Sequence, residues 1–102
     1  MPDLYVIVAL FDFGEFPIFN KLVGTAKDSR IAFDKLEKYD CEKVIGSKYE
    51  MSIEEDAPRS KEIGIQEDSN KLFYEETRRY RYQIKGEEEK YPVKVTLSIF
   101  QA

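Results

Sequence analysis

Histidine is absent from the 102-residue sequence, and cysteine occurs only once. Without histidine there can be no Ser-His-Asp triad, no imidazole base and no histidine-ligated metal. A single cysteine excludes an intramolecular disulfide and any metal site with two cysteine ligands. The five glycines form none of the glycine-rich motifs that cradle nucleotide phosphates. We therefore expect a protein that is not an enzyme and that uses no metal or cofactor.

Long hydrophobic runs are also missing, since no stretch approaches the roughly 20 apolar residues that span a bilayer. Hydrophobic residues nonetheless make up 42% of the chain, which is typical of a globular protein. The length fits one domain over residues 1–102. No basic segment precedes the first apolar stretch, as it would in a signal peptide, and the lone Cys41 suits a reducing compartment. We expect a cytoplasmic protein that makes no contact with membranes.

The first apolar segment, Leu4 to Phe11, is apolar at both odd and even positions. A strand of this kind is normally central in its sheet and covered on both faces. Turn residues surround Gly14, and Phe16 to Val23 predicts a second strand in which Pro17 marks the start or an edge. We expect these two segments to form a hairpin.

A helix is expected next, because Gly24 to Ser29 breaks the strand pattern and an amphipathic segment runs on to about Tyr39. Thr25 and Asp28 have the spacing of a capping box, although Asp28 or Ser29 could also cap the helix alone. The inward stripe consists of Ala32, Leu36 and Tyr39, widened by Ile31 and Phe33.

The middle of the chain predicts one strand and one long loop. Val44 to Ile53 has an apolar face at odd positions, and Gly46 within it indicates a bulge or a bend. Glu54 to Asn70 is highly charged and contains Pro58 and Gly64. A loop of this length is usually functional or mobile. Within it, Ile63 and Ile65 are expected to form a short strand or an anchor.

The last third alternates with a period of two, first over Leu72 to Lys85 and then over Tyr91 to Ile99. The intervening segment contains Gly86, so the two runs predict a hairpin. We therefore expect an α+β fold: a twisted antiparallel sheet of four to six strands with one helix packed on one face, in the order β-β-α-β-β-β.

Arg78 falls on the apolar side of its predicted strand and therefore needs a buried carboxylate partner. Glu76 shares that face, and Glu50 or Glu54 are alternatives. Cys41 follows the predicted helix at its C-terminal end, where the helix dipole disfavours a thiolate. We interpret it as a small, partly buried thiol rather than as a nucleophile.

The acidic loops are the first candidate binding surface. The chain has 16 Lys and Arg against 20 Asp and Glu, a net charge of −4. Charge runs in loops are usually just solvated, but acidic loops can also bind basic partners by electrostatic complementarity. An apolar patch around the first turn could add to such a surface. The candidate partner-binding residues are Glu54, Glu55, Asp56, Glu87, Glu88 and Glu89, together with Phe16 and Phe19.

The basic and aromatic segment Thr77 to Tyr82 is the alternative candidate surface. Basic side chains neutralise phosphates and aromatic rings stack on bases. A nucleic-acid or nucleotide binder would use Arg79, Arg81, Lys85 and Lys94. The simpler interpretation is an outer strand face with cross-strand charge pairs, and the negative net charge also opposes general phosphate binding.

These observations favour a non-enzymatic protein-binding module over a nucleic-acid binder or a small enzyme with carboxylates and arginine in a cleft. The most concrete form is a small acidic inhibitor, an immunity protein or a phage-encoded antagonist of a defence enzyme. Its partner would be another protein with a basic surface. Because one helix cannot cover both faces of the first strand, we also expect a homo-oligomer.

Overall fold

The protein is described here by a computed structural model that covers residues 4–14, 19–46, 51–55, 58–63 and 72–101. Six strands and two helices confirm the expected α+β class. In chain order they are β1 (Tyr5–Asp12), β2 (Phe19–Ala26), α1 (Ser29–Lys38), α2 (Cys41–Gly46), β3 (Met51–Glu55), β4 (Ser60–Ile63), β5 (Leu72–Ile84) and β6 (Lys90–Gln101).

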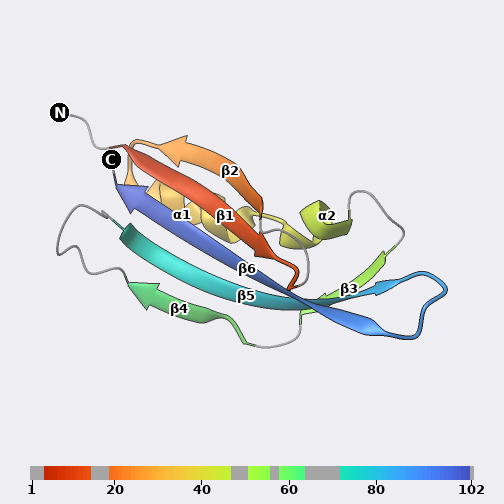
Figure 1. The fold of residues 1–102 in the computed structure, drawn as a ribbon. Helices are drawn as coiled ribbons and strands as arrows, with labels where there is room; N and C mark the ends of the chain where they lie inside the picture. Colours follow the sequence, from red (N-terminus) through yellow and green to blue (C-terminus); the bar gives the residue numbers. More distant parts are fainter. Residues whose placement is uncertain (1–3, 15–18, 47–50, 56–57, 64–71, 102) are drawn as a thin grey trace.

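All six strands belong to one antiparallel sheet with the order β2-β1-β6-β5-β3. The long strand β5 pairs with β3 near one end and with β4 near the other, so β3 and β4 share one edge and β2 forms the opposite edge (Figure 1). Both expected hairpins, β1–β2 and β5–β6, are confirmed. In each turn a glycine adopts a positive φ, Gly14 at 86° and Gly86 at 91°, which other residues rarely adopt.

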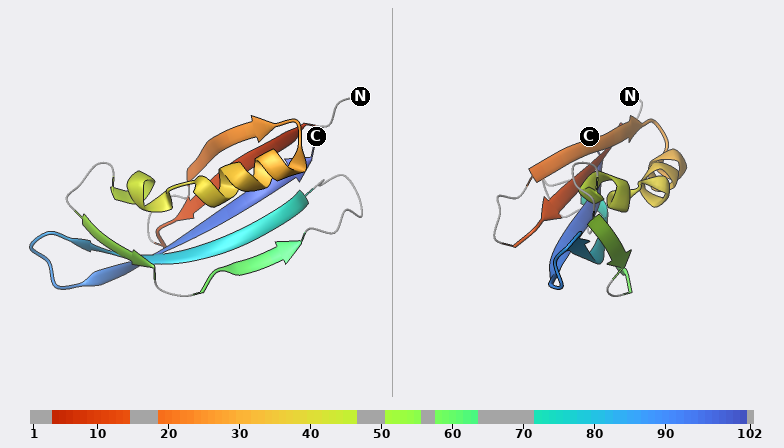
Figure 2. Two further views of the ribbon diagram at one scale, coloured as in Figure 1. Left: turned by 180° about the vertical axis from the view of Figure 1, so that it is seen from behind. Right: turned by 90° about the vertical axis from the view of Figure 1, so that its right-hand side faces the viewer.

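Both helices lie on one side of the sheet, as the views from behind and from the end show (Figure 2). We call this side the helix face and the opposite side the outer face. Helix α1 packs across β2, β1 and β6, and α2 packs beside β3. The face turned to the viewer in Figure 1 is the outer face, and neither helix lies on it.

The core lies between the helix face and α1. Burial alternates along β5 and β6, as the sequence predicts. It also alternates along β1, although the two apolar sides of this segment predict a strand covered on both faces. Phe33 of α1 packs its ring against the rings of Phe73 and Tyr74, with centroids 5.8 and 4.7 Å apart. The side chains with no exposed surface are Ile7, Ala9, Phe11, Ala32, Leu36, Val95, Leu97 and Ile99, together with the charged Glu76.

Strand β2 runs farther than predicted and the Thr25 capping box is wrong, whereas Asp28 as a cap by itself is confirmed. Gly24 to Ala26 extend β2, since Ala26 pairs with Tyr5 and Thr25 with Val6. Asp28 is the N-cap, and its side chain accepts a hydrogen bond of 2.7 Å from the Arg30 backbone N–H. Because the helix begins at Ser29, Ala32 and Leu36 face the sheet, whereas Ile31, expected on the inward stripe, is 49% exposed.

The predicted strand from Val44 to Ile53 is wrong in its first part. Residues Cys41–Gly46 form a second short helix that places Cys41 and Ile45, four residues apart, in the core. Asp40 caps it by accepting a bond of 3.0 Å from the Lys43 backbone N–H. Gly46 is therefore helical rather than a bulge, and the strand β3 begins only at Met51.

Part of the segment predicted as a long loop is strand, since Glu54 and Glu55 belong to β3 and Ser60–Ile63 form β4. Ile63 belongs to β4, which confirms a short strand at this point. Ile65, the other residue predicted there, lies outside the described residues.

The molecule is elongated, with extents of 53 × 24 × 22 Å. Its radius of gyration is 15.0 Å, against about 13 Å for a compact domain of this length. The cause is the end of the β5–β6 hairpin, which projects beyond β1 and β2 with β3 beside it (Figure 1). Among the described residues, neither helix is long or apolar enough to cross a membrane.

Candidate functional site

The outer face carries an apolar patch over β1 and its two neighbours. Val6, Val8 and Leu10 alternate with the buried residues of β1 and are half-buried. Leu22 of β2 pairs with Val8, and Phe100 of β6 pairs with Val6. Leu22 is 62% exposed and Phe100 36%. The second apolar side of the first strand is therefore present, but neither α1 nor α2 covers it. We call these five residues the outer apolar patch.

Basic side chains lie farther along the same face. Arg79 of β5 pairs with Lys94 of β6, and both are exposed. Carboxylates interrupt this cluster, because Asp12 pairs with Lys94 and Glu54 pairs with Arg81. Lys85 lies apart from them, at the hairpin turn, and is exposed. The structure thus brings Arg79, Arg81 and Lys94 to one face, but intersperses them with acidic groups.

The predicted acidic residues gather at the projecting end of the β5–β6 hairpin. Glu87, Glu88 and Glu89 form its turn, and Glu54 of β3 lies close enough for Lys90 to donate a bond of 2.9 Å to its carboxylate. This bond, with the lysine charge, lowers the pKa of Glu54. Glu88 is exposed. We call Glu54 and Glu87 to Glu89 the acidic hairpin end.

Glu87 and Glu89 are held by a tyrosine. The Tyr91 hydroxyl lies 3.1 Å from the Glu87 carboxylate and 3.4 Å from that of Glu89. The bond to Glu87 is the main reason why the pKa of Tyr91 rises to about 12. The Tyr91 ring stacks on Tyr82, with centroids 5.2 Å apart. The hairpin end is therefore ordered by side-chain contacts rather than being only a solvated charge run.

The remaining predicted partner-binding residues do not join these surfaces. Glu55 forms an ion pair of 3.0 Å with Arg59, on the other side of β3 from the hairpin end. Asp56 and Phe16 lie outside the described residues. The backbone of Phe19 pairs with Phe11 at the start of β2, while its side chain also lies outside the description.

Arg78 forms the buried polar centre of the molecule together with Glu76 and Tyr74. It is 1% exposed and forms an ion pair with Glu76, which is fully buried. This confirms the first of the three partners that the sequence offered. The Tyr74 hydroxyl donates a bond of 2.9 Å to the same carboxylate. A charge taken out of water needs such partners, since an unpaired one costs several kcal/mol.

Arg78 also caps helix α1, which sequence reasoning missed. Its guanidinium donates bonds of 3.1 Å to the carbonyl oxygens of Leu36 and Tyr39. The last carbonyls of a helix have no partners within the helix, and a cation is favourable there. The sequence around Tyr39, the C-cap of α1, has no glycine that could end the helix. The lack of a glycine cap was the hint in the sequence that another group caps this end.

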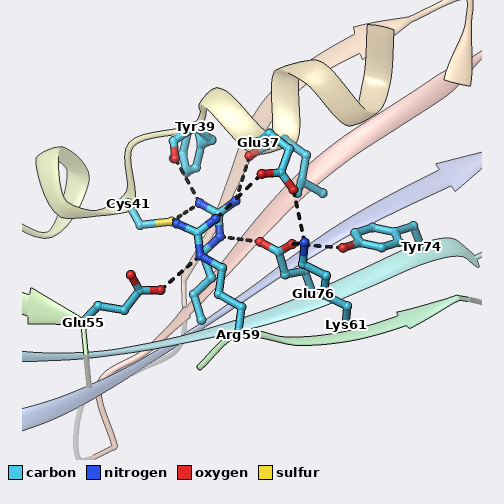
Figure 3. Close-up of polar contacts among 10 residues, drawn as sticks. Glu37, Tyr39, Cys41, Glu55, Arg59, Lys61, Tyr74 and Glu76 are labelled. Carbon is cyan, nitrogen blue, oxygen red and sulfur yellow. Dashed lines mark hydrogen bonds and ion pairs between the residues drawn. The ribbon is translucent and has the colours of Figure 1, made fainter. Parts of the chain in front are cut away.

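Further ion pairs lie beside this centre and are formed by Glu37, Arg59 and Lys61 (Figure 3). Glu37 of α1 lies 3.8 Å from Arg59 and 3.7 Å from Lys61. Lys61 also approaches Glu76 to 3.8 Å. These pairs join β4 to the C-terminal end of α1. Exposed pairs contribute little individually, so their main effect is to fix where this edge of the sheet lies.

The Cys41 thiol is poorly placed to act as a nucleophile. Cys41 is 1% exposed, and burial raises the pKa of its thiol, despite the opposing effects of Tyr80 and Arg78. The thiol therefore stays protonated near neutral pH, and thiolate is the nucleophilic form. Among the described residues, no group of three or more Asp, Glu or Cys side chains could hold a metal ion.

A groove on the helix face is a feature that sequence reasoning missed entirely. It lies between β2 and the two helices and has a volume of about 640 Å³. Only the tertiary structure brings its lysines together, because they come from three separate elements. Its lining residues are Lys21, Val23, Asp34, Lys35, Lys38, Tyr39, Asp40, Lys43 and Val44. We call it the lysine groove.

Comparison with known proteins adds no family to this picture. No protein-family model matches the chain. A search of curated proteins and one of solved structures likewise gave no significant match. The surfaces open to a functional interpretation are the outer face, the acidic hairpin end and the lysine groove.

Proposed function

We propose that the chain is a non-enzymatic module that binds another protein through the outer face of its sheet. The observation that carries the proposal is the outer apolar patch. Its side chains lie on a sheet face that no described helix covers, and Leu22 is 62% exposed. Contiguous exposed apolar surface of this kind marks interaction sites in soluble proteins.

The surroundings of the patch support this proposal. Protein interfaces combine an apolar centre with a polar, charged rim. Here Arg79, Lys94 and Asp12 lie on the same face beyond Leu10, and Glu75 lies on the β5 side. Rim charges of both signs provide specificity and faster association rather than most of the affinity.

The acidic hairpin end supports a finer proposal, that of a small acidic inhibitor or immunity-type antagonist with a basic partner. It projects from the body, and Glu88 is exposed. Lys90 offsets part of its charge through the bond to Glu54. A basic groove on the partner would be attracted to such a projection at low ionic strength.

Site-specific photo-crosslinking in the source cells tests the surface directly. A photoreactive residue replaces Leu22 on the outer face, Glu88 at the hairpin end or, as the control, Ile31. Ile31 is also exposed and apolar, at 49%, but lies on α1. We expect a discrete protein adduct from positions 22 and 88 and none from position 31. An adduct that forms only from position 31, or nucleic acid captured from position 22, would contradict the proposal.

A nucleic-acid binder is the second candidate, because Arg79 and Lys94 lie opposite each other and both are exposed. Titration with single- and double-stranded nucleic acid separates the two candidates. The first variant is Arg79→Glu with Arg81→Glu, and the second replaces Glu87, Glu88 and Glu89 by lysine. The protein-binding proposal predicts that the second variant associates more slowly with the protein partner at low salt, while the first, which changes charges of a mixed rim, slows association less. Loss of nucleic-acid binding by the arginine variant alone would favour the second candidate.

A further inference from the structure

The lysine groove lies on the opposite side of the sheet from the proposed protein-binding face, so it needs a separate explanation. Four lysines and two aspartates line it, in a chain whose net charge is −4. Clefts lined by one sign of charge attract ligands of the other sign. The groove is therefore a locally positive site on a negative molecule.

Two of the four lysines are already engaged within the protein. Lys35 donates a bond of 2.7 Å to the carbonyl oxygen of Thr25. Lys38 forms an ion pair of 3.1 Å with Asp34. The other aspartate, Asp40, accepts the backbone N–H of Lys43 as the cap of α2. The carboxylates of the groove are thus occupied by local structure.

The other two lysines, Lys21 of β2 and Lys43 of α2, are available to a ligand. Both are exposed, and neither ammonium group has a carboxylate partner within the described parts of the chain. They approach the groove from its two walls, the edge strand and the second helix. Together they supply two positive charges, which match the charge of about −1.5 to −2 of a phosphate monoester at neutral pH.

Apolar side chains occupy the space between these walls. Val23, Tyr39 and Val44 line the groove and are half-buried. The volume of about 640 Å³ lies within the range of about 300–1,000 Å³ that is usual for small-molecule sites. A single inorganic ion would leave most of it empty. The lining therefore combines ammonium groups with apolar side chains, which suits a ligand that carries both an anionic group and a ring.

From this combination we propose that the lysine groove binds a nucleoside monophosphate, with the phosphate between Lys21 and Lys43 and the nucleoside against Val23, Tyr39 and Val44. The phosphate is held by two point charges. Lysine ammonium groups bind phosphates in this way, without the two-point geometry of arginine.

Titration with adenosine monophosphate, followed by backbone amide chemical shifts in NMR, tests the proposal. We expect saturable shifts at Val23, Tyr39 and Val44. Adenosine, which lacks the phosphate, and inorganic phosphate, which lacks the nucleoside, should each bind at least about tenfold more weakly, since each loses one half of the contacts. Equal binding of adenosine and the monophosphate would overturn the proposal, as would the absence of saturable shifts at these residues.

Matched lysine variants complete the test. Lys21→Met with Lys43→Met removes two charges from the groove and should weaken binding about tenfold or more. Lys27→Met with Arg30→Met removes two exposed charges elsewhere and should change binding less than about twofold. Lys21→Arg with Lys43→Arg should retain binding. An equal loss in both methionine variants would show attraction to net charge alone and would overturn the site. None of these outcomes bears on the outer face, so the two proposals fail independently.

Discussion

At the scale of single residues, Arg78 connects the sheet to the helix layer. One side chain pairs with Glu76 on its own strand and donates to the Leu36 and Tyr39 carbonyls at the end of α1. The sequence indicated the first partner, because both residues fall on the apolar side of β5. The helix carbonyls could not be predicted, since they lie 39 and 42 residues away in the chain.

Arg78→Met should lower the free energy of unfolding by about 3–5 kcal/mol, because it leaves the Glu76 carboxylate buried without its cation. Denaturant titration measures the change. The matched control is Arg79→Met, one residue along and exposed, which should cost less than about 0.5 kcal/mol. Adding Glu76→Gln to Arg78→Met should recover part of the loss. Similar losses of unfolding free energy in the two arginine variants would show that Arg78 does not stabilise the buried Glu76 carboxylate.

Alkaline pH should destabilise the protein through its buried tyrosines and thiol. Burial raises the pKa values of Tyr74, Tyr80 and Cys41 above the ordinary 10.0 for tyrosine and 9.0 for cysteine. The folded state then keeps protons that the unfolded state releases, so the stability contribution is complete below about pH 9 and declines as the pH rises. Urea midpoints from about pH 7 to about pH 11 should fall, and Tyr80→Phe should make that decline shallower. A profile that stays flat in the wild type would contradict the assignment.

At the scale of elements, strong period-two patterns predicted strands correctly, whereas weaker patterns did not distinguish a strand from a helix. The β5–β6 hairpin was predicted correctly because each strand alternates over many residues with one face buried. The last part of helix α2, from Val44 to Gly46, was predicted as strand, because Ile45 continues the apolar odd positions of the segment up to Ile53 and Gly46 fits a bulge. Its helical form depends on the Asp40 cap and on burial of Cys41 and Ile45 together, which is a tertiary effect.

Strand β6 offers a direct test of register. Leu97 is fully buried, so Leu97→Ala should cost about 2–5 kcal/mol in unfolding free energy, the usual range for a buried leucine. Ser98, its neighbour, lies on the outer face opposite Val8, and Ser98→Ala should cost less than about 0.5 kcal/mol. Denaturant midpoints rank the two variants. The reverse order would place the strand one residue out of register.

At the scale of the whole molecule, the fold has two layers, the sheet and the helices on its helix face. The helices cover the helix face, and the outer apolar patch has no described element over it. In the free protein, where the proposed partner is absent, a second copy of the chain would bring two such patches together with two-fold symmetry, the commonest arrangement among soluble oligomers.

Light scattering at micromolar concentration should therefore give a mass of about 24 kDa, twice the 12.0 kDa of the chain. Leu22→Asp should convert this species to monomer, because a carboxylate in the apolar centre of an interface is costly. Ile31→Asp, an equivalent change at an exposed residue of α1, should leave the mass unchanged. A single 12 kDa species in the wild type would exclude self-association, and the outer face would then be left to a different protein.

The sequence by itself determined the α+β class, the two hairpins, the inward face of β5 and β6 and the need of Arg78 for a buried carboxylate partner, with Glu76 as one of three candidates. These follow from local periodicity and from the cost of burying a charge without a partner. Only the tertiary structure decided that Lys21, Lys35, Lys38 and Lys43 line one groove, that Arg78 caps α1 and that neither α1 nor α2 covers the outer side of β1. Each of these depends on which distant elements pack together, and no local pattern along the chain encodes that choice.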